Sequence, residues 1–179
     1  MTKITDKKNA APVVILDRDG TIIADKNYLA RAEQVELLPN AAAGLRQMQR
    51  AGCRLLVATN QSGIGRGYFT VADYEKVATR LAALLADEGV RLDGVYYCPH
   101  SPTDGCACRK PRAGLVERAA REWRFAWRDC VVIGDKPSDI ELGKNIGARL
   151  SIIIGAEKGG ADAAVADLVE AAERIKVES

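Results

Sequence analysis

The sequence contains no long apolar run. A membrane-spanning helix needs roughly 18 consecutive apolar residues, and none of the 179 residues belongs to such a stretch. Residues 1–11 are polar and carry three lysines, with no apolar segment behind them that could serve as a secretory signal. We therefore expect a flexible N-terminal tail over residues 1–11 and a cytoplasmic protein that makes no membrane contact.

Charge of one sign is not in excess either. The chain has 26 Lys and Arg against 24 Asp and Glu, a net charge of +2, and its basic residues are scattered instead of forming a stripe. This distribution gives no support for a nucleic-acid-binding surface. A hydrophobic share of 47% over 179 residues is enough to bury one core, so residues 12–179 are predicted to form a single domain, which we expect to be a monomer.

Histidine is nearly absent, and the odd number of cysteines argues against a framework of disulfides. The only histidine, His100, lies among three of the five cysteines, Cys98, Cys106 and Cys108, in the pattern Cys-x-His-x5-Cys-x-Cys. Three thiolates and one imidazole match a tetrahedral Zn²⁺ site, and the zinc would be structural because the protein fills all four positions. The alternatives are a disulfide or a chance cluster, and a reducing compartment argues against the first.

Short apolar runs rich in Val, Ile and Leu alternate with helical patterns, which predicts an α/β fold with a doubly wound parallel sheet. The expected strands are Val13–Leu16, Arg54–Thr59, Gly94–Cys98, Cys130–Gly134 and Leu150–Ile154. The expected helices are Ala41–Ala51 after an Asn40 cap, Thr70–Glu88, Ala113–Trp123, Pro137–Asn145 and a final helix opened by Asp167. Cys53 and Cys130 fall at strand edges, where we expect them to be buried as small hydrophobic residues.

The first apolar run ends in Asp17-Arg18-Asp19-Gly20-Thr21. Because residues two apart on a strand point the same way, Asp17 and Asp19 should both reach the carboxyl end of the sheet. If the strand order reverses at this strand, Asp135 at the end of the fourth run faces Asp17. Asp17, Asp135 and a backbone carbonyl near Asp19 could then hold Mg²⁺. The alternatives are surface-turn acids for the first pair and a helix cap for Asp135, and capping is the favoured prediction for Asp139.

Two further segments carry groups suited to phosphate. Thr59 and Asn60 end the second run, where a hydroxyl and exposed backbone N–H groups can donate to a phosphate oxygen; the alternative is an ordinary polar turn. Arg109 and Lys110 stand side by side before a helix, where they could neutralise a phosphate or simply be solvated. Long loops at the carboxyl ends of strands are predicted to build the binding crevice, and they are Ile22–Pro39, Gln61–Phe69 and Pro99–Lys110.

Taken together, these segments resemble the haloacid dehalogenase superfamily of phosphohydrolases from about Val13 to Leu168. The motifs that carry the resemblance are Asp17-Arg18-Asp19-Gly20-Thr21, Thr59, Lys110, and Gly134-Asp135 followed by Asp139. The resemblance implies that Asp17 is the nucleophile, Asp19 the general acid and base, and Asp135 a magnesium ligand with Asp17. The chain has no insertion long enough for a separate cap domain, so we expect the loops to set specificity.

The zinc-loop pattern and the segment from Thr59 to Gly67 narrow the resemblance to heptose bisphosphate 7-phosphatases and the related histidinol-phosphate phosphatases. The five-residue spacer between His100 and Cys106 is similar to the histidinol-phosphate branch, whereas Arg66-Gly67 is similar to the heptose branch. We favour the heptose branch, and with it ADP- or GDP-heptose synthesis, because Arg66 offers a cation for a second phosphate. The non-enzymatic alternative is a zinc-loop docking module. The implied contacts to a small phosphorylated sugar are Asn60, Arg66 and Arg109.

Overall fold

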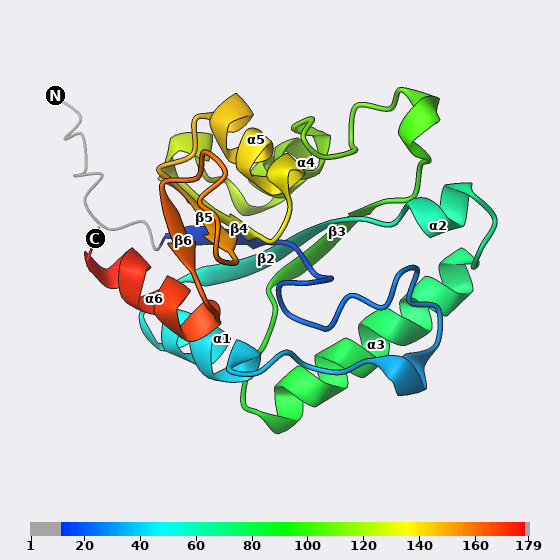
Figure 1. Ribbon diagram of the computed structural model, residues 1–179, viewed down its shortest axis with the longest axis horizontal. Coiled ribbons are helices and arrows are strands. Elements are labelled where there is room, and N and C mark those ends of the chain that lie inside the picture. The colour runs from blue at the N-terminus through cyan, green and yellow to red at the C-terminus, as the bar shows by residue number, and fades with distance from the viewer. Residues whose placement is uncertain (1–11, 178–179) are drawn as a thin grey trace, which may run out of the picture.

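The structure is a computed structural model that describes residues 12–177, and its centre is a six-stranded parallel sheet (Figure 1). The sheet order is β3-β2-β1-β4-β5-β6, so the order reverses at β1 and the doubly wound fold is confirmed. The expected tail, residues 1–11, lies outside the described residues. The strands are β1 (Val13–Leu16), β2 (Arg54–Asn60), β3 (Gly94–Cys98), β4 (Cys130–Gly134), β5 (Leu150–Ile154) and β6 (Ala163–Val165).

Helices cover both faces of the sheet. In Figure 1, α4 and α5 lie on one side and α1, α3 and α6 on the other. Between residues 12 and 177, no helix is both long and apolar enough to cross a membrane. The α-helices are α1 (Ala41–Arg50), α2 (Ser62–Gly65), α3 (Val71–Asp87), α4 (Gly114–Trp123), α5 (Pro137–Ile146) and α6 (Leu168–Val177), and short 3-10 helices span Ala32–Gln34, Pro102–Asp104 and Trp127–Asp129.

The two faces of β1 explain its unbroken apolar sequence. Val14 and Leu16 pack into the larger core with α1, α3 and α6, whereas Val13 and Ile15 pack into the second core with α4 and α5. Alternate residues of a strand point to opposite faces, so a strand covered on both sides must be apolar throughout. Since β1 lies at the centre of the sheet, its buried residues fix the place where Asp17 emerges.

Local sequence signals account for the start of α3 but not for that of α1. Thr70 caps α3, accepting a hydrogen bond from the backbone N–H of Asp73 at 3.2 Å, while the Asp73 carboxylate accepts from the backbone N–H of Thr70 at 3.0 Å. The expected Asn40 side-chain cap is wrong. Asn40 adopts a φ of 63° and its amide donates to the Asp167 carboxylate at 2.6 Å, which ties the start of α1 to the start of α6.

The strand β6 was not predicted. It has three residues and pairs in parallel with β5, from Ile152 opposite Ala163 to Ile154 opposite Val165. Ala-Ala-Val is too short and too weakly β-forming to stand out from a loop, and its pairing depends on β5 being beside it.

Candidate active site

The acids predicted from separate motifs meet where the strand order reverses. Asp17 follows β1 and Asp135 follows β4, which are adjacent and in register from Val13 opposite Cys130. The backbone N–H of Asp17 extends this pairing, donating to the carbonyl of Ile133 at 2.9 Å. Carboxylate oxygens of Asp17, Asp135 and Asp139 lie within 4.8 Å of one another, a group that could hold a metal ion.

Lys110 is the cation of this acidic group. Its Nζ lies 2.8 Å from Oδ1 of Asp17 and 2.7 Å from Oδ1 of Asp139, and all three side chains are buried. Burial by itself would lower the pKa of Lys110, but the charges of the two carboxylates outweigh it and raise the pKa above its usual range. Lys110 is therefore a fixed positive charge at the base of the site.

Asp139 was expected to serve only the helix end, and this expectation is incomplete. Its Oδ2 does accept from the backbone N–H of Lys136 at 3.1 Å, at the start of α5. Its other oxygen binds the buried Lys110 ammonium. Both oxygens are thus engaged, and Asp139 supports the lysine as well as the helix.

Asp135 forms no ion pair within residues 12–177, since Lys110 pairs with Asp17 and Asp139 and Lys136 pairs with Asp25. Burial, followed by the charge of Asp17, raises the pKa of Asp135 to about 6, and the nearest side-chain donor is the Thr21 hydroxyl at 3.5 Å. Gly20 adopts a φ of +83°, and a Cβ there would come within 2.2 Å of the Asp135 carboxylate. With three carboxylates around one ammonium, hard oxygen ligands and negative charge remain in surplus, which fits Mg²⁺.

Asp19 is not one of the three acids that could hold a metal ion. Its carboxylate instead accepts hydrogen bonds from two neighbouring side chains. Arg18 donates from Nε and Nη2 at 3.0 Å each, in a two-pronged contact. Gln61 donates from Nε2 to Oδ2 at 2.9 Å. Neither Arg18 nor Gln61 was predicted as a site residue, although both stand inside the motifs. Polar side chains of these types are rarely buried, and their burial cannot be inferred from spacing.

A cavity of about 240 Å³ opens beside Asp19, Arg18 and Gln61, whereas the side chains grouped around Lys110 are not part of its lining. All three predicted long loops contribute to it, which confirms that they build the crevice, and Lys136 and Ser138 from the start of α5 add a fourth segment. Its lining residues are Arg18, Asp19, Asp25, Asn27, Tyr28, Leu29, Asn60, Gln61, Ser62, Gly63, Arg109, Lys136 and Ser138.

The predicted substrate contacts differ in where they lie. Arg109 lines the cavity, and its buried Nη1 has no hydrogen-bond partner among residues 12–177. Asn60 also lines it, but its side-chain amide is bound to the backbone of Lys110, donating to the carbonyl at 3.1 Å and accepting from the N–H at 3.0 Å. Arg66 is exposed beyond α2 and is not part of the cavity lining.

The predicted zinc ligands come together. Sulfur-to-sulfur distances among Cys98, Cys106 and Cys108 are 3.2 to 3.5 Å, and Nδ1 of His100 lies 3.2 Å from Cys108 and 3.6 Å from Cys98. Ligands about 2.3 Å from a tetrahedral ion would be about 3.8 Å apart, so the cluster fits Zn²⁺ after slight expansion.

The thiols of this cluster differ in acidity. Burial raises the pKa of the Cys98 thiol to about 12. Burial also opposes ionisation of Cys106, but hydrogen bonds led by that from Cys98 outweigh it and lower its pKa to about 7. One thiolate therefore forms near neutral pH, and a cation would favour ionisation of the others.

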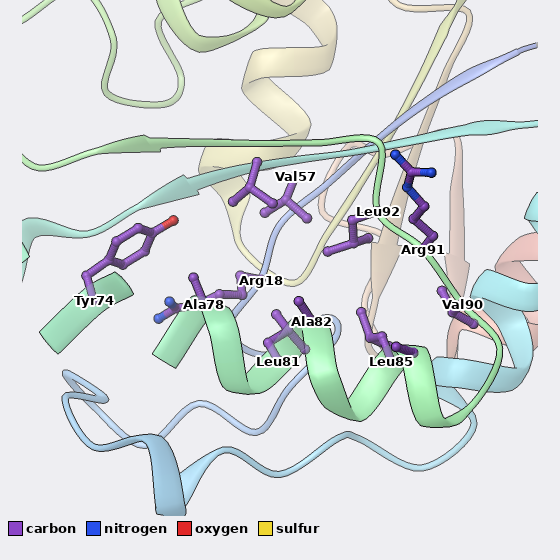
Figure 2. Close-up of a pocket in the computed structure, with 12 residues that line it drawn as sticks. Arg18, Val57, Tyr74, Ala78, Leu81, Ala82, Leu85, Val90, Arg91 and Leu92 are labelled. Atoms are coloured by element: carbon purple, nitrogen blue, oxygen red, sulfur yellow. The ribbon is translucent and has the colours of Figure 1, made fainter. Parts of the chain in front are cut away.

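A second cavity, of about 290 Å³, runs along α3 beneath β2 and β3 (Figure 2). Aliphatic side chains such as Val57, Leu81 and Leu85 form most of its wall. Among residues 12–177, Arg18 is the one residue that lines both this cavity and the polar cavity of about 240 Å³. No aspartate of the site lines the cavity along α3. Because Asp19 lines the smaller, polar cavity, we assign the chemistry to that cavity.

Comparisons with known proteins agree with this geometry. Residues 107–173 match the HAD-hydrolase-like family model. The chain is 39% identical over 147 residues to the D-glycero-beta-D-manno-heptose-1,7-bisphosphate 7-phosphatase of Helicobacter pylori, covering 82% of this chain and 85% of the relative. The chain belongs to the haloacid dehalogenase superfamily of phosphatases. It is thus an enzyme, a phosphoric monoester hydrolase.

Other relatives of this haloacid dehalogenase phosphatase are named for the same activity. The heptose-1,7-bisphosphate 7-phosphatase of Escherichia coli K12 is 35% identical over 155 residues, 82% of this chain and 81% of the relative. The crystal structure of D,D-heptose 1,7-bisphosphate phosphatase from B. bronchiseptica, complexed with magnesium and phosphate, superposes with a TM-score of 0.84 at 28% identity, covering 94% of this chain and 99% of that one.

Proposed function

We propose that this enzyme removes the 7-phosphate from D-glycero-D-manno-heptose 1,7-bisphosphate through an aspartyl-phosphate at Asp17. The observation that carries the proposal is the buried ion pair between Asp17 and Lys110, together with a polar cavity lined by their sequence neighbours Asp19 and Arg109. The relatives at 35% and 39% identity are named heptose-1,7-bisphosphate 7-phosphatases, which supports the choice of substrate.

The position of Asp17 suits a nucleophile. Lys110 engages Oδ1, which leaves Oδ2 without an ion-pair partner in the part of the chain that the structure describes. In the proposed first step an oxygen of Asp17 attacks phosphorus, the bond from phosphorus to the sugar oxygen breaks, and Asp19 gives its proton to that oxygen. Water then attacks the aspartyl-phosphate, and Asp19 takes a proton from this water as phosphate leaves.

The distribution of partners suggests which acids would hold Mg²⁺. Asp139 is occupied by Lys110 and by the backbone of Lys136, whereas the side-chain hydrogen bond of Asp135 within residues 12–177 is the long one from Thr21 at 3.5 Å. Asp17 and Asp135 are therefore the proposed side-chain ligands, with the backbone carbonyl of Asp19 as a third. When bound there, Mg²⁺ would neutralise charge on the phosphoryl oxygens.

Groups around the rim provide contacts for the rest of the substrate. We assign Arg109 to phosphate, because a guanidinium nitrogen without a partner can donate to its oxygens. Tyr28 lines the cavity and contacts Tyr68 edge-on with ring centroids 4.8 Å apart, which joins the first and second long loops beside it. Arg66 lies outside this wall, so its contact with the second phosphate requires a substrate that extends beyond the cavity.

The test is a substrate panel with Mg²⁺ or with chelator. It contains both anomers of heptose 1,7-bisphosphate, the corresponding monophosphates and histidinol phosphate, and the position of the remaining phosphate is read by NMR. We expect fastest release of the 7-phosphate from one bisphosphate anomer. Faster hydrolysis of histidinol phosphate would overturn the substrate, without affecting the assignment of the nucleophile.

The nucleophile is tested separately with Asp17→Asn, which keeps the shape of the side chain and removes its charge. We expect folded protein with no turnover on any member of the panel. Asp87→Asn, at the exposed end of α3, serves as the matched control and should retain wild-type turnover. Retained hydrolysis by Asp17→Asn would refute the aspartyl-phosphate mechanism.

A further inference from the structure

We propose that Gln61 is a positioning residue that fixes the carboxylate of Asp19 for proton transfer. This inference rests on the proposed function, in which Asp19 is the acid and base. Gln61 is the first residue after β2, only 5% exposed, and its side-chain amide contacts three polar side chains from two strand ends.

Every hydrogen-bonding group of the Gln61 amide is accounted for. The two N–H bonds of Nε2 donate to Oδ2 of Asp19 at 2.9 Å and to Oγ1 of Thr59 at 2.8 Å. Oε1 accepts from Nη2 of Arg18 at 3.1 Å. Turning the amide over would set Oε1 against the Asp19 carboxylate and Nε2 against a guanidinium N–H, so only one orientation is compatible with these neighbours.

Arg18 forms the other half of this support. Its guanidinium binds both oxygens of Asp19 and also Gln61, so the three groups form a closed ring of hydrogen bonds. The outer side of Arg18 lies over the ring of Tyr74, 5.5 Å from its centroid, and Figure 2 shows both residues at the same end of the cavity along α3. Contact with Tyr74 on α3 thereby fixes the orientation of the Arg18 guanidinium, and with it the orientation of the Asp19 carboxylate that Arg18 binds.

The hydrogen bonds from Arg18 and Gln61 restrict rotation of the Asp19 carboxylate. Asp19 is separate from the three acids that could hold a metal ion, which are Asp17, Asp135 and Asp139. Arg18 contacts both oxygens, whereas Gln61 adds its bond to Oδ2 alone and so distinguishes the two. Proton transfer to the sugar oxygen requires a donor oxygen at hydrogen-bond distance and in the right direction. A carboxylate anchored by Arg18 alone retains freedom that Gln61 removes.

The test is a double-mutant cycle on the phosphomonoester that the substrate panel finds to be hydrolysed fastest. Phosphate release is measured for the wild type, Gln61→Met, Asp19→Asn and the double variant. Gln61→Met preserves the length of the buried side chain and removes its hydrogen bonds. We expect kcat to fall about 10- to 100-fold with KM nearly unchanged, since misplacing a general acid loses part of a rate factor of about 10²–10⁴.

The interaction between the two substitutions separates positioning from a structural role. If Gln61 acts through Asp19, Gln61→Met should lower kcat less than about threefold in the Asp19→Asn background. Multiplicative losses in the double variant, or an unchanged kcat in Gln61→Met, would overturn the inference. If Asp19→Asn alone keeps full activity, the proposed mechanism fails instead, and the two failures are distinguishable.

Two further variants serve as a control and as an alternative substitution at Gln61. Gln47→Met makes the same substitution on α1, away from both cavities, and should leave kcat unchanged. If Gln61→Met does not fold, Gln61→Glu keeps the size and the acceptor facing Arg18 but replaces the donor facing Asp19. The same loss of kcat is expected from it, and wild-type kcat in a folded Gln61→Glu would contradict the inference.

Discussion

The replacement Lys110→Met tests how much the buried ion pairs contribute to stability. It keeps an unbranched side chain of similar length but removes the ammonium that lies 2.8 Å from Asp17 and 2.7 Å from Asp139. The exposed fractions of the Lys110, Asp17 and Asp139 side chains are 3%, 6% and 2%. Water therefore cannot solvate the two carboxylates once the ammonium is removed. Three carboxylates would then face one another without a cation in the metal-free protein.

Breaking a buried ion pair by removing one partner costs about 3–5 kcal/mol, because the remaining charge stays desolvated. For a domain of this size, about 2–4 °C in Tm corresponds to each kcal/mol, so the expected loss is about 6–20 °C. The pKa of Lys110 is raised above its unfolded value of 10.5, so its contribution is fully present below that pH and is lost as the pH rises through the folded pKa. A measurement at pH 7.5 therefore detects the whole effect.

The assay is urea unfolding of metal-free protein at pH 7.5, followed by circular dichroism. The matched control is Lys76→Met, whose partner Asp73 lies 3.4 Å away with the lysine side chain 70% exposed, and for which a loss of about 0–1 kcal/mol is expected. At acid pH the carboxylates of the Lys110→Met variant become protonated, so its deficit should shrink. A deficit at pH 7.5 no larger than that of the control would refute the reasoning.

Two further predictions concern the zinc cluster and the wall of α3. We predict that wild-type protein contains zinc and that Cys106→Ala lacks it and has lower activity, which metal analysis and phosphate release would measure. Full activity in zinc-free protein would show that the loop has no role in the reaction. Tyr74→Phe should be neutral or stabilising by about 1 kcal/mol in urea unfolding at pH 7.5, because it removes a buried hydroxyl without a hydrogen-bond partner in the described chain. Burial raises the pKa of Tyr74 from 10.0 to about 12, so the wild type loses stability between those pH values and the variant's advantage should grow there; a constant difference would contradict this.

The sequence was sufficient for most of the fold because a central parallel strand must be apolar on both faces. β1 and β4 satisfy this rule without interruption, and their boundaries are those predicted. The Asn40 cap failed for a different reason. Asn is a favourable cap when only the local chain is considered, but Asp167, 127 residues away, supplies a charged partner that no local pattern contains.

The site was predictable only as far as its groups follow from strand ends. Asp17 and Asp135 each follow directly after a strand and Thr59 is the second-last residue of β2, and the switch in strand order brings them to one edge. Arg18 and Gln61 were not predicted, because their roles depend on side chains from different strands closing around Asp19. Side-chain networks of this kind have no periodicity, so a sequence pattern does not reveal them.

The hydrogen bonds and ion pairs of Lys110 and Arg109 predict which kinetic constant should change most when the zinc cluster is disrupted. Lys110 is held through its backbone by Asn60 and through its ammonium by the two aspartates, independently of the cysteines. Among residues 12–177, Nη1 of Arg109 has no hydrogen-bond partner, its backbone N–H binds Cys106, and it directly follows Cys108. Loss of zinc in Cys106→Ala should therefore disturb substrate binding by Arg109 more than the charge at Asp17, raising KM by a larger factor than it lowers kcat. An equal or larger effect on kcat would mean that the cluster, and not Asn60, fixes the lysine.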